Sequence, residues 1–131
     1  MTVTPIDLFA SFIHLQQGGQ VRAEQPAFDP ERDGWQLMAF HVETDADVHA
    51  DHWEVHPDAD EFVACLTGGI RLHFRPQQPG EEEEEEGIQL VAGTAVIVPR
   101  GRWHRMALEA PGDLMSVTLP RGSRLEKRNG A

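Results

Sequence analysis

The sequence predicts an all-β fold, either an antiparallel barrel or a sandwich. From residue 35 onward, apolar and polar residues alternate in short segments, which is the period of a β-strand. Glycine and proline interrupt these segments roughly every ten residues, as in small all-β domains. The chain has 131 residues, enough for a single domain with one core, and shows no internal repeat beyond this rhythm.

The first 34 residues are expected to lie outside the barrel. Thr4 suits a helix N-cap and Pro5 the first helical position, which predicts a short helix over residues 4–15. Residues 20–34 are polar and contain prolines, so we expect a loop with a brief strand around residues 20–23. Three apolar residues recur at helical spacing in the predicted helix: Ile6, Phe9 and Ile13.

The predicted strands of the barrel cover most of the remaining chain. An acidic low-complexity loop over residues 76–87 separates two of them, and its like charges predict a solvated, mobile segment. Residues 121–131 form a basic tail, expected to be a solvated terminus or to pack against an acidic surface. Strands are expected over residues 35–43, 48–56, 61–67, 69–75, 88–91, 94–98, 103–108 and 113–119.

The composition limits which binding partners and which cellular compartment we expect for this protein. The formal net charge is −11, six charges of which come from residues 81–86, so nucleic acid is not an expected partner. No apolar run is long enough to span a bilayer, and no secretory signal pattern precedes residue 35, so neither membrane insertion nor export is expected. Cys65 is the only cysteine; it alternates with apolar neighbours, which indicates a buried thiol and suits the reducing cytoplasm.

One predicted strand carries an unusual face. On residues 48–56, alternation places His52, Glu54 and His56 on the same side. Glu54 and His56 are two residues apart, roughly 6.6 Å along a strand, so both side chains can converge on one ion. Three such residues are atypical of a protein core and indicate the lining of a wet or metal-filled cavity.

Two spaced motifs carry a family resemblance. The first reads Glu54-x-His56, four residues, Glu61, six residues, Gly68; the second reads Gly93, five residues, Pro99-x-Gly101, two residues, His104. These motifs resemble the two signature motifs of the cupin superfamily. The resemblance spans roughly residues 35–120 and implies a double-stranded β-helix, a jelly-roll-type barrel, with the short N-terminal helix outside it. There are three departures from the family pattern: Val48 for the leading glycine, Glu54 for the first histidine and Leu108 for the closing asparagine.

The resemblance also implies a metal site inside the barrel near one mouth. His56, Glu61 and His104 form a set of two histidines and one carboxylate, which occupies one face of an octahedral ion and leaves positions open. Glu54 is interpreted either as a fourth ligand or as a catalytic general base beside a three-ligand ion. The expected cofactor is a divalent metal ion, Fe, Mn, Zn or Ni; the alternative is a metal-free polar cluster.

Other residues are weaker candidates for the site. His52, one pleat before Glu54, and His73 are candidates for substrate binding. Arg71 and Arg102 are interpreted as surface arginines or as contacts for an anionic substrate. His49 and His14 are expected to be surface or packing residues.

Two classes of function remain open at this point. One is a metal-dependent enzyme acting on a small organic molecule, of dioxygenase, isomerase, decarboxylase or lyase type. The other is a non-catalytic cupin that binds a small ligand or metal as a sensor or accessory protein. An apolar pocket that reaches an open coordination site would favour the enzyme. We also expect a homodimer, because Trp53, Trp103 and the N-terminal helix would expose much apolar surface.

Overall fold

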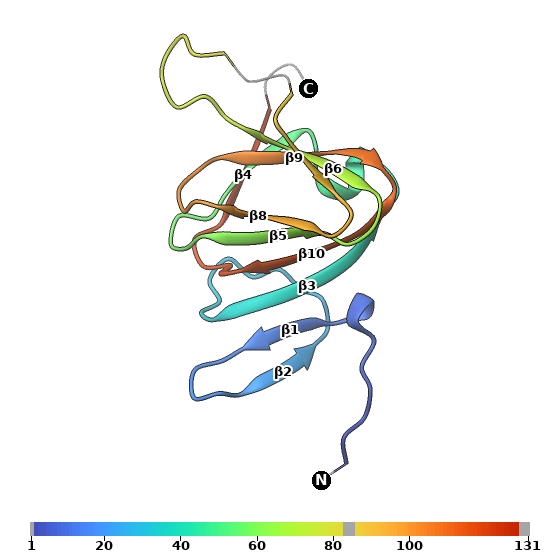
Figure 1. Cartoon of the computed structure of the whole chain (residues 1–131). Helices are drawn as coiled ribbons and strands as arrows, with labels where there is room; N and C mark the ends of the chain where they lie inside the picture. The colour runs from blue at the N-terminus through green and yellow to red at the C-terminus, as the bar shows by residue number, and fades with distance from the viewer. Residues whose placement is uncertain (1, 83–85, 129–131) are drawn as a thin grey trace.

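A computed structural model describes residues 2–82 and 86–128 of the chain. In this part of the protein almost all regular structure is β, and two antiparallel sheets face each other around a common interior (Figure 1). The two facing sheets form a double-stranded β-helix. The all-β prediction is therefore confirmed.

The described elements follow one another without a long helix. Short strands and two 3₁₀ turns are joined by turns and loops, as the spacing of glycine and proline predicts. In chain order they are η1 (Leu8–Ala10), β1 (Phe12–Leu15), β2 (Val21–Glu24), β3 (Trp35–Val42), η2 (Asp45–Val48), β4 (His52–Val55), β5 (Glu61–Cys65), β6 (Gly69–Phe74), β7 (Ile88–Val91), β8 (Thr94–Val98), β9 (His104–Ala110), β10 (Gly112–Thr118) and β11 (Arg124–Lys127).

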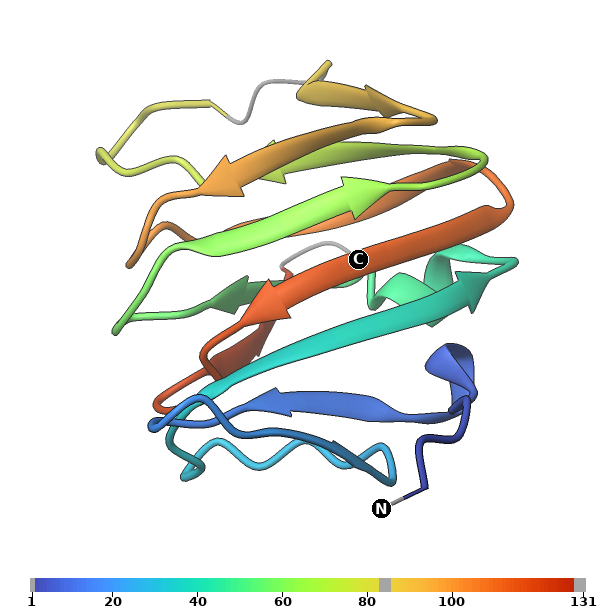
Figure 2. The same ribbon diagram turned by 60° about the horizontal axis from the view of Figure 1, so that its bottom comes forward.

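The strands form two sheets, which we call sheet A and sheet B. Among the described residues, sheet A has the order β2-β1-β3-β10-β5-β8 and sheet B the order β11-β4-β9-β6-β7. Figure 2 shows sheet A toward the viewer with sheet B behind it. Since β4 and β9 belong to one sheet and β5 to the other, side chains at their neighbouring ends can meet between the sheets.

Strand alternation explains the core. On β10 every second residue is buried, and Leu114 and Ser116 point inward while Val117 points outward. The inward apolar residues of both sheets pack together and bury Cys65 completely, as expected for an inert thiol. The central cluster contains Val42, Val48, Val63, Cys65, Ile70, Leu72, Leu90, Val98 and Leu114.

The structure explains why the first motif closes with a glycine, Gly68. It adopts φ +78°, and a Cβ atom at this position would lie 2.4 Å from the carbonyl oxygen of Pro111. Any other residue would therefore push apart the β5–β6 and β9–β10 turns.

The prediction of an N-terminal helix is wrong. Only the 3₁₀ turn η1 forms there, with the Asp7 side chain accepting a hydrogen bond from the Phe9 amide at 3.0 Å. Residues 12–15 instead form β1, which pairs with β2 on one side and β3 on the other. A helix of this length is marginal alone, whereas pairing satisfies the backbone groups of the strand on both sides.

Two other segments differ from expectation. The strand predicted over residues 48–56 is shorter, because η2 takes its beginning and β4 starts at His52. The basic tail contains β11, which pairs with all four residues of β4. Part of the acidic run, residues 83–85, lies outside the described residues. In the described chain, no helix has the length and apolar character needed to cross a membrane.

Candidate metal centre

Four side chains meet at one end of the barrel interior. Glu54 lies on β4 and His56 directly follows that strand, while Glu61 and His104 are the first residues of β5 and β9. In the register of sheet B, Glu54 is directly opposite His104. The structure therefore brings together the four metal-site residues that the sequence motifs indicated.

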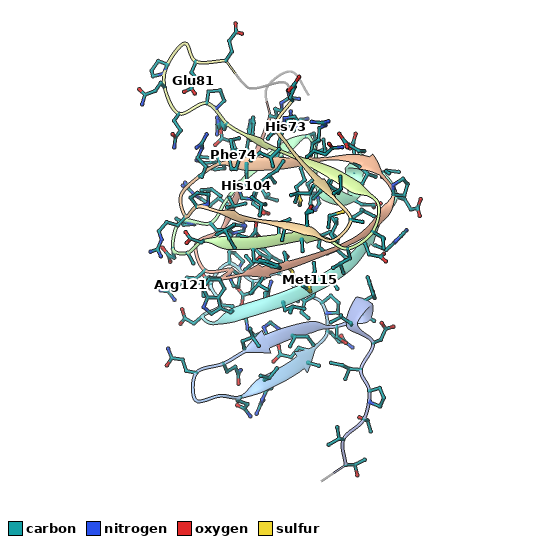
Figure 3. All side chains as sticks on the ribbon, viewed as in Figure 1. His73, Phe74, Glu81, His104, Met115 and Arg121 are labelled. Atoms are coloured by element: carbon teal, nitrogen blue, oxygen red, sulfur yellow. The ribbon has the colours of Figure 1, made fainter. Side chains whose placement is uncertain are left out.

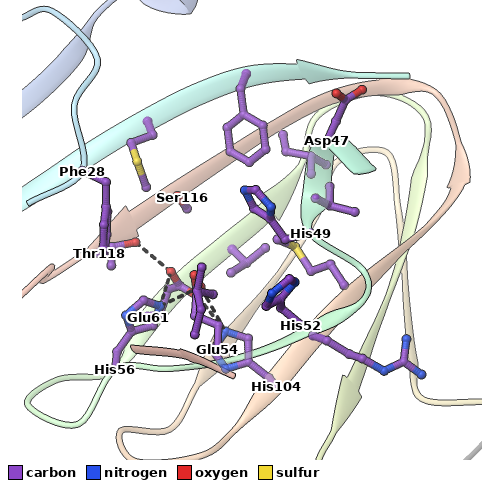
Figure 4. Close-up of a pocket in the computed structure, with 18 of the residues that line it drawn as sticks. Phe28, Asp47, His49, His52, Glu54, His56, Glu61, His104, Ser116 and Thr118 are labelled. Carbon is purple, nitrogen blue, oxygen red and sulfur yellow. Dashed lines mark hydrogen bonds and ion pairs between the residues drawn. The ribbon is translucent and has the colours of Figure 1, made fainter. Parts of the chain in front are cut away.

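Their donor atoms are close enough to share one ion. One ligand atom from each of the four residues can be chosen so that all lie within 4.8 Å of one another. Nε2 of His56 is 3.0 Å from Oε1 of Glu54 and 3.0 Å from Oε2 of Glu61. Nε2 of His104 is 3.1 Å from Oε1 of Glu61 and 3.7 Å from Oε1 of Glu54. Figure 4 shows the four side chains converging.

The turns of the two motifs are tied to each other. The Gly101 amide donates to the carbonyl oxygen of His56 at 2.9 Å, and the Arg100 amide donates to Oδ1 of Asp60 at 2.8 Å. Gly101 takes φ +75°, a conformation that glycine adopts at little cost. These two bonds hold the turn before β5 against the turn before β9, so His56 and His104 keep a fixed separation.

The far side of each histidine ring is also held. Nδ1 of His56 donates to Oγ of Ser123 at 2.7 Å, and Nδ1 of His104 donates to the carbonyl oxygen of Arg102 at 3.0 Å. With a proton on each Nδ1, both Nε2 atoms present their lone pairs to the centre when the rings are neutral. Thr118 donates to Oε2 of Glu61 at 2.7 Å and orients that carboxylate as well.

In the absence of an ion the cluster is a network of charges. Burial lowers the pKa of His56, but the carboxylates of Glu54 and Glu61 outweigh it and raise the pKa to about 10. Burial lowers the pKa of His104 as well, but the Glu61 carboxylate raises it above its ordinary value. Burial raises the pKa of Glu61, but the His104 and His56 rings outweigh this effect and lower it to about 2. The carboxylates and imidazoliums thus stabilise one another.

The cluster forms the polar end of a cavity of about 360 Å³. Apolar side chains from both sheets, together with Phe28 of the β2–β3 loop, make up much of the remaining wall (Figure 4). Glu54 is 33% exposed whereas Glu61 is 6% exposed, so Glu54 is the more accessible carboxylate of the cluster. The apolar part of the wall comprises Phe12, Phe28, Met38, Phe40, Val48, Val63, Met106, Leu114, Met115 and Leu125.

The structure separates the two predicted substrate contacts. His52 lines the cavity, with its Nδ1 bonded to Oδ1 of Asp51 at 2.8 Å. His73 does not reach the cavity, so the expectation of a substrate contact there is corrected. On β6 the inward residues are Ile70 and Leu72, and alternation turns His73 to the outer face, where it packs against Gly87 (Figure 3).

Sequence reasoning missed three residues of the site. His49, expected at the surface or in packing, lies in the cavity wall with left-handed backbone angles, φ 51° and ψ 46°. A residue in this conformation follows from tertiary structure rather than from a pattern. Ser123 and Thr118 lie far from both motifs in sequence, and a single serine or threonine gives no signal of its own.

The donor set fits a divalent transition metal. Two imidazole nitrogens and one or two carboxylates suit Fe, Mn, Zn or Ni, and both imidazoles have the outer hydrogen bonds typical of metal ligands. Because the donor atoms of the cluster come from both sheets, closure of the barrel itself assembles the cluster.

Comparisons with known proteins give the fold but no closer relative. No protein-family model matches the chain, and no curated protein matches its sequence. Among solved structures, a protein with a double-stranded β-helix domain from Klebsiella pneumoniae is 17% identical, with a TM-score of 0.50 over 77% of this chain and 75% of that one. A cupin-2 domain protein from Shewanella frigidimarina is 22% identical, with a TM-score of 0.49 over 72% of this chain and 79% of that one.

An enzyme structure shares the same fold. Fe(II)-HppE with the alternative substrate (S)-1-HPP is 20% identical, with a TM-score of 0.50. The match covers 65% of this chain but only 42% of that chain. At these identities the similarity shows the fold alone, and it confirms the double-stranded β-helix.

Proposed function

We propose that this protein is a metal-dependent enzyme that acts on a small, largely apolar organic molecule. The observation that supports it is the position of the Glu54, His56, Glu61 and His104 cluster at the end of a mainly apolar cavity. A cavity of about 360 Å³ falls in the size range of small-molecule sites. The apolar wall would bind the body of the molecule and bring one of its polar groups to the cluster.

The four residues divide into two roles. His56, Glu61 and His104 are deeply buried and held by outer hydrogen bonds, so they would hold the ion. Glu54 is more exposed and belongs to the same cavity, so it would take a proton from the substrate as general base. When bound, a divalent ion in such a site supplies Lewis acidity, or redox chemistry if it is iron or manganese.

Iron is the first metal to test, because one neighbour of the same fold is an Fe(II) enzyme. Reactions of dioxygenase, isomerase, decarboxylase or lyase type are all compatible with a metal, a base and an apolar cavity. The fold itself does not choose between them, since unrelated reactions use it.

A second candidate function is a non-catalytic metal- or ligand-binding protein. One distance favours it: Oε1 of Glu54 is 3.0 Å from Nε2 of His56, as close as the Glu61 carboxylate. If Glu54 moved onto the ion as a fourth ligand, the site would be more closed and more anionic. The role of Glu54 therefore discriminates between the two functions.

The test is metal content per chain after purification without a nickel column. Replacing His56, Glu61 or His104 by Ala should remove most of the metal, because each change deletes one ligand and leaves the others in a buried pocket. Glu54→Ala should retain metal and lose turnover if Glu54 is a base, but lose metal if it is a ligand. Glu54→His should still bind metal, with an altered preference.

His41 offers a matched control. It too contacts two carboxylates, Glu43 and Asp113, but it lies on the outside of the barrel. His41→Ala should keep full metal content. The proposal is refuted if wild type stays empty after loading with Fe, Mn, Zn and Ni in turn, or if His56→Ala and His104→Ala remain fully occupied.

A further inference from the structure

Arg102 has no carboxylate partner among the described residues, in contrast to the nearby Arg75 and Arg100. Arg75 pairs with Glu126 at 2.9 Å, and Arg100 approaches Asp60 to 3.9 Å. The Arg102 guanidinium instead stacks over the Phe74 ring at 4.7 Å, and its Nε is buried without a hydrogen-bond partner. A partly buried guanidinium is costly unless its donors are satisfied, so this arrangement requires an explanation.

Arg102 borders a hollow distinct from the metal cavity. The hollow has a volume of about 390 Å³ and is formed by the end of β6 and the turn that precedes β9. The Arg75 amide donates to the carbonyl oxygen of Trp103 at 3.0 Å and ties these two segments together. The walls of the hollow are therefore fixed. Its lining consists of Arg75, Pro76, Gln77, Gly101, Arg102 and Trp103.

Positive charge is concentrated around this hollow in an otherwise acidic protein. Two more guanidiniums lie over the Trp103 ring, that of Arg75 at 5.3 Å and that of Arg124 at 5.5 Å. Two acidic groups lie nearby, and both are already bonded: Glu126 accepts from Arg75, and Glu81 accepts from the Gln77 amide at 3.2 Å. The Arg102 charge remains uncompensated by these acids.

We propose that this hollow, the arginine hollow, binds a small oxyanion, a phosphate or carboxylate group. Guanidinium groups are suited to such ligands because they offer paired donors in one plane. Arg102 would supply the main contact and Arg75 and Gln77 further donors. The site adjoins the metal centre, since the Arg102 carbonyl oxygen accepts from Nδ1 of His104 at 3.0 Å. Figure 3 shows Phe74 and His104 close together, on neighbouring strands.

Titration of the metal-free protein with inorganic phosphate or with acetate tests this site independently of any metal. In ¹H–¹⁵N spectra at constant ionic strength, the Trp103 indole and the Gly101 and Gln77 amides should shift and saturate. Arg102→Gln should weaken binding at least about tenfold, because a charged hydrogen-bonding group is removed. If Arg102→Gln does not fold, Arg75→Gln tests the same hollow.

Arg100→Gln is the matched control. Arg100 lies in the same turn, is 67% exposed and does not line the hollow. Its loss should change anion affinity less than about twofold, within the range expected for surface charges. Saturation by phosphate alone or acetate alone identifies the oxyanion that the site prefers. The proposal is overturned if neither anion gives saturable shifts, if Arg100→Gln weakens binding as much as Arg102→Gln, or if the shifts map to His56 and Glu61 instead.

Discussion

Glu54 and Glu61 carry the same side chain, but their surroundings differ and suit them to the two roles that we propose. Glu61 is buried between two histidines and receives a hydrogen bond from Thr118, so its orientation is fixed. Glu54 contacts the same histidines from a strand that also lines the cavity, and a third of its surface is exposed. A fixed carboxylate suits an ion, and a reachable one suits a proton transfer.

Ser123 should matter for metal affinity although it touches no metal. Its hydroxyl accepts from Nδ1 of His56, and both groups are buried. Ser123→Ala leaves that N–H unpaired, which costs about 1–3 kcal/mol. We expect metal affinity to fall about 10–100-fold, measured by competition with a chromophoric chelator. Ser116→Ala, which removes another buried hydroxyl from the cavity wall, should change affinity little; an equal loss there would contradict the role given to Ser123.

The stability of the metal-free protein should depend on pH through His56. Its pKa is raised from 6.5 to about 10, so the stabilisation is fully present below pH 6.5 and is lost as the pH rises through about 10. Glu61 acts oppositely: its pKa is lowered from 4.5 to about 2, so its contribution is lost as the pH falls through about 2. Urea unfolding from pH 6 to 10 should give a falling free energy of unfolding. In His56→Gln the fall should be much shallower, and an unchanged slope would exclude His56 as its source.

At the residue scale, the sequence predicted the members of the cluster better than the residues that support them. Glu54, His56, Glu61 and His104 stand at motif spacings that strand geometry translates directly into one cluster. Ser123 comes close to His56 only when β11 pairs with β4, a contact between residues 67 positions apart. Alternation in the sequence already puts His73 on the face of its strand opposite Ile70 and Leu72, and in the structure this face is turned away from the cavity.

At the element scale, the structure differs from the elements predicted from sequence where pairing between strands outweighs the local sequence pattern. The apolar residues of segment 4–15 fit helical spacing, but β3 offers an open edge and takes residues 12–15 as β1. The basic tail contains no apolar alternation, yet Arg124–Lys127 form β11 because β4 otherwise shares a single registered pair with β9. The central strands were predictable because both local alternation and turn residues agreed with the fold.

β11 should therefore be necessary for stability and for the metal centre. Deleting residues 125–131 removes most of its pairing with β4, the strand that carries Glu54. At about 0.5–1.5 kcal/mol per backbone hydrogen bond, the free energy of unfolding should fall by at least about 2 kcal/mol. Urea unfolding of the metal-free protein measures this. Deleting only residues 129–131 leaves β11 complete and should have little effect; similar losses in both variants would contradict the role of β11.

At the scale of the whole molecule, the outer face of sheet A carries an apolar band across all six strands. One row of registered residues crosses the sheet from β2 to β8: Ala23, Ile13, Leu37, Val117, Phe62 and Ile97. A second row joins Val21, Leu15 and Trp35. This face, toward the viewer in Figure 2, includes Val21 at 60% and Ile97 at 59% exposure.

The reason to expect a homodimer is now the outer face of sheet A, and no longer the two tryptophans or the N-terminal helix. Trp53 is only 5% exposed and stacks with Arg105, Trp103 is stacked by arginines, and the N-terminal helix does not form. These features do not leave the apolar surface that we expected from them. The outer face of sheet A does, and an apolar patch this continuous is typical of an interface.

We propose that two copies pair through the outer faces of their A sheets. Six strands at about 4.8 Å spacing make a face about 24 Å wide, enough for a contact near 800 Å² per partner, and the apolar rows of two such faces can pack sheet on sheet. The exposed pair of His41 and Asp113 would lie at the end of this contact. Light scattering at micromolar concentration should give twice the chain mass of 14.6 kDa.

Ile97→Glu and Trp35→Glu, one toward each end of the face, should each shift the protein toward monomer, because a charge would be buried at the contact. Val91→Glu is the control: Val91 is 51% exposed but lies on β7 of sheet B, so this variant should remain dimeric. A single-chain mass for wild type at every concentration, or equal dissociation by Val91→Glu, would show that the chains do not associate through this face.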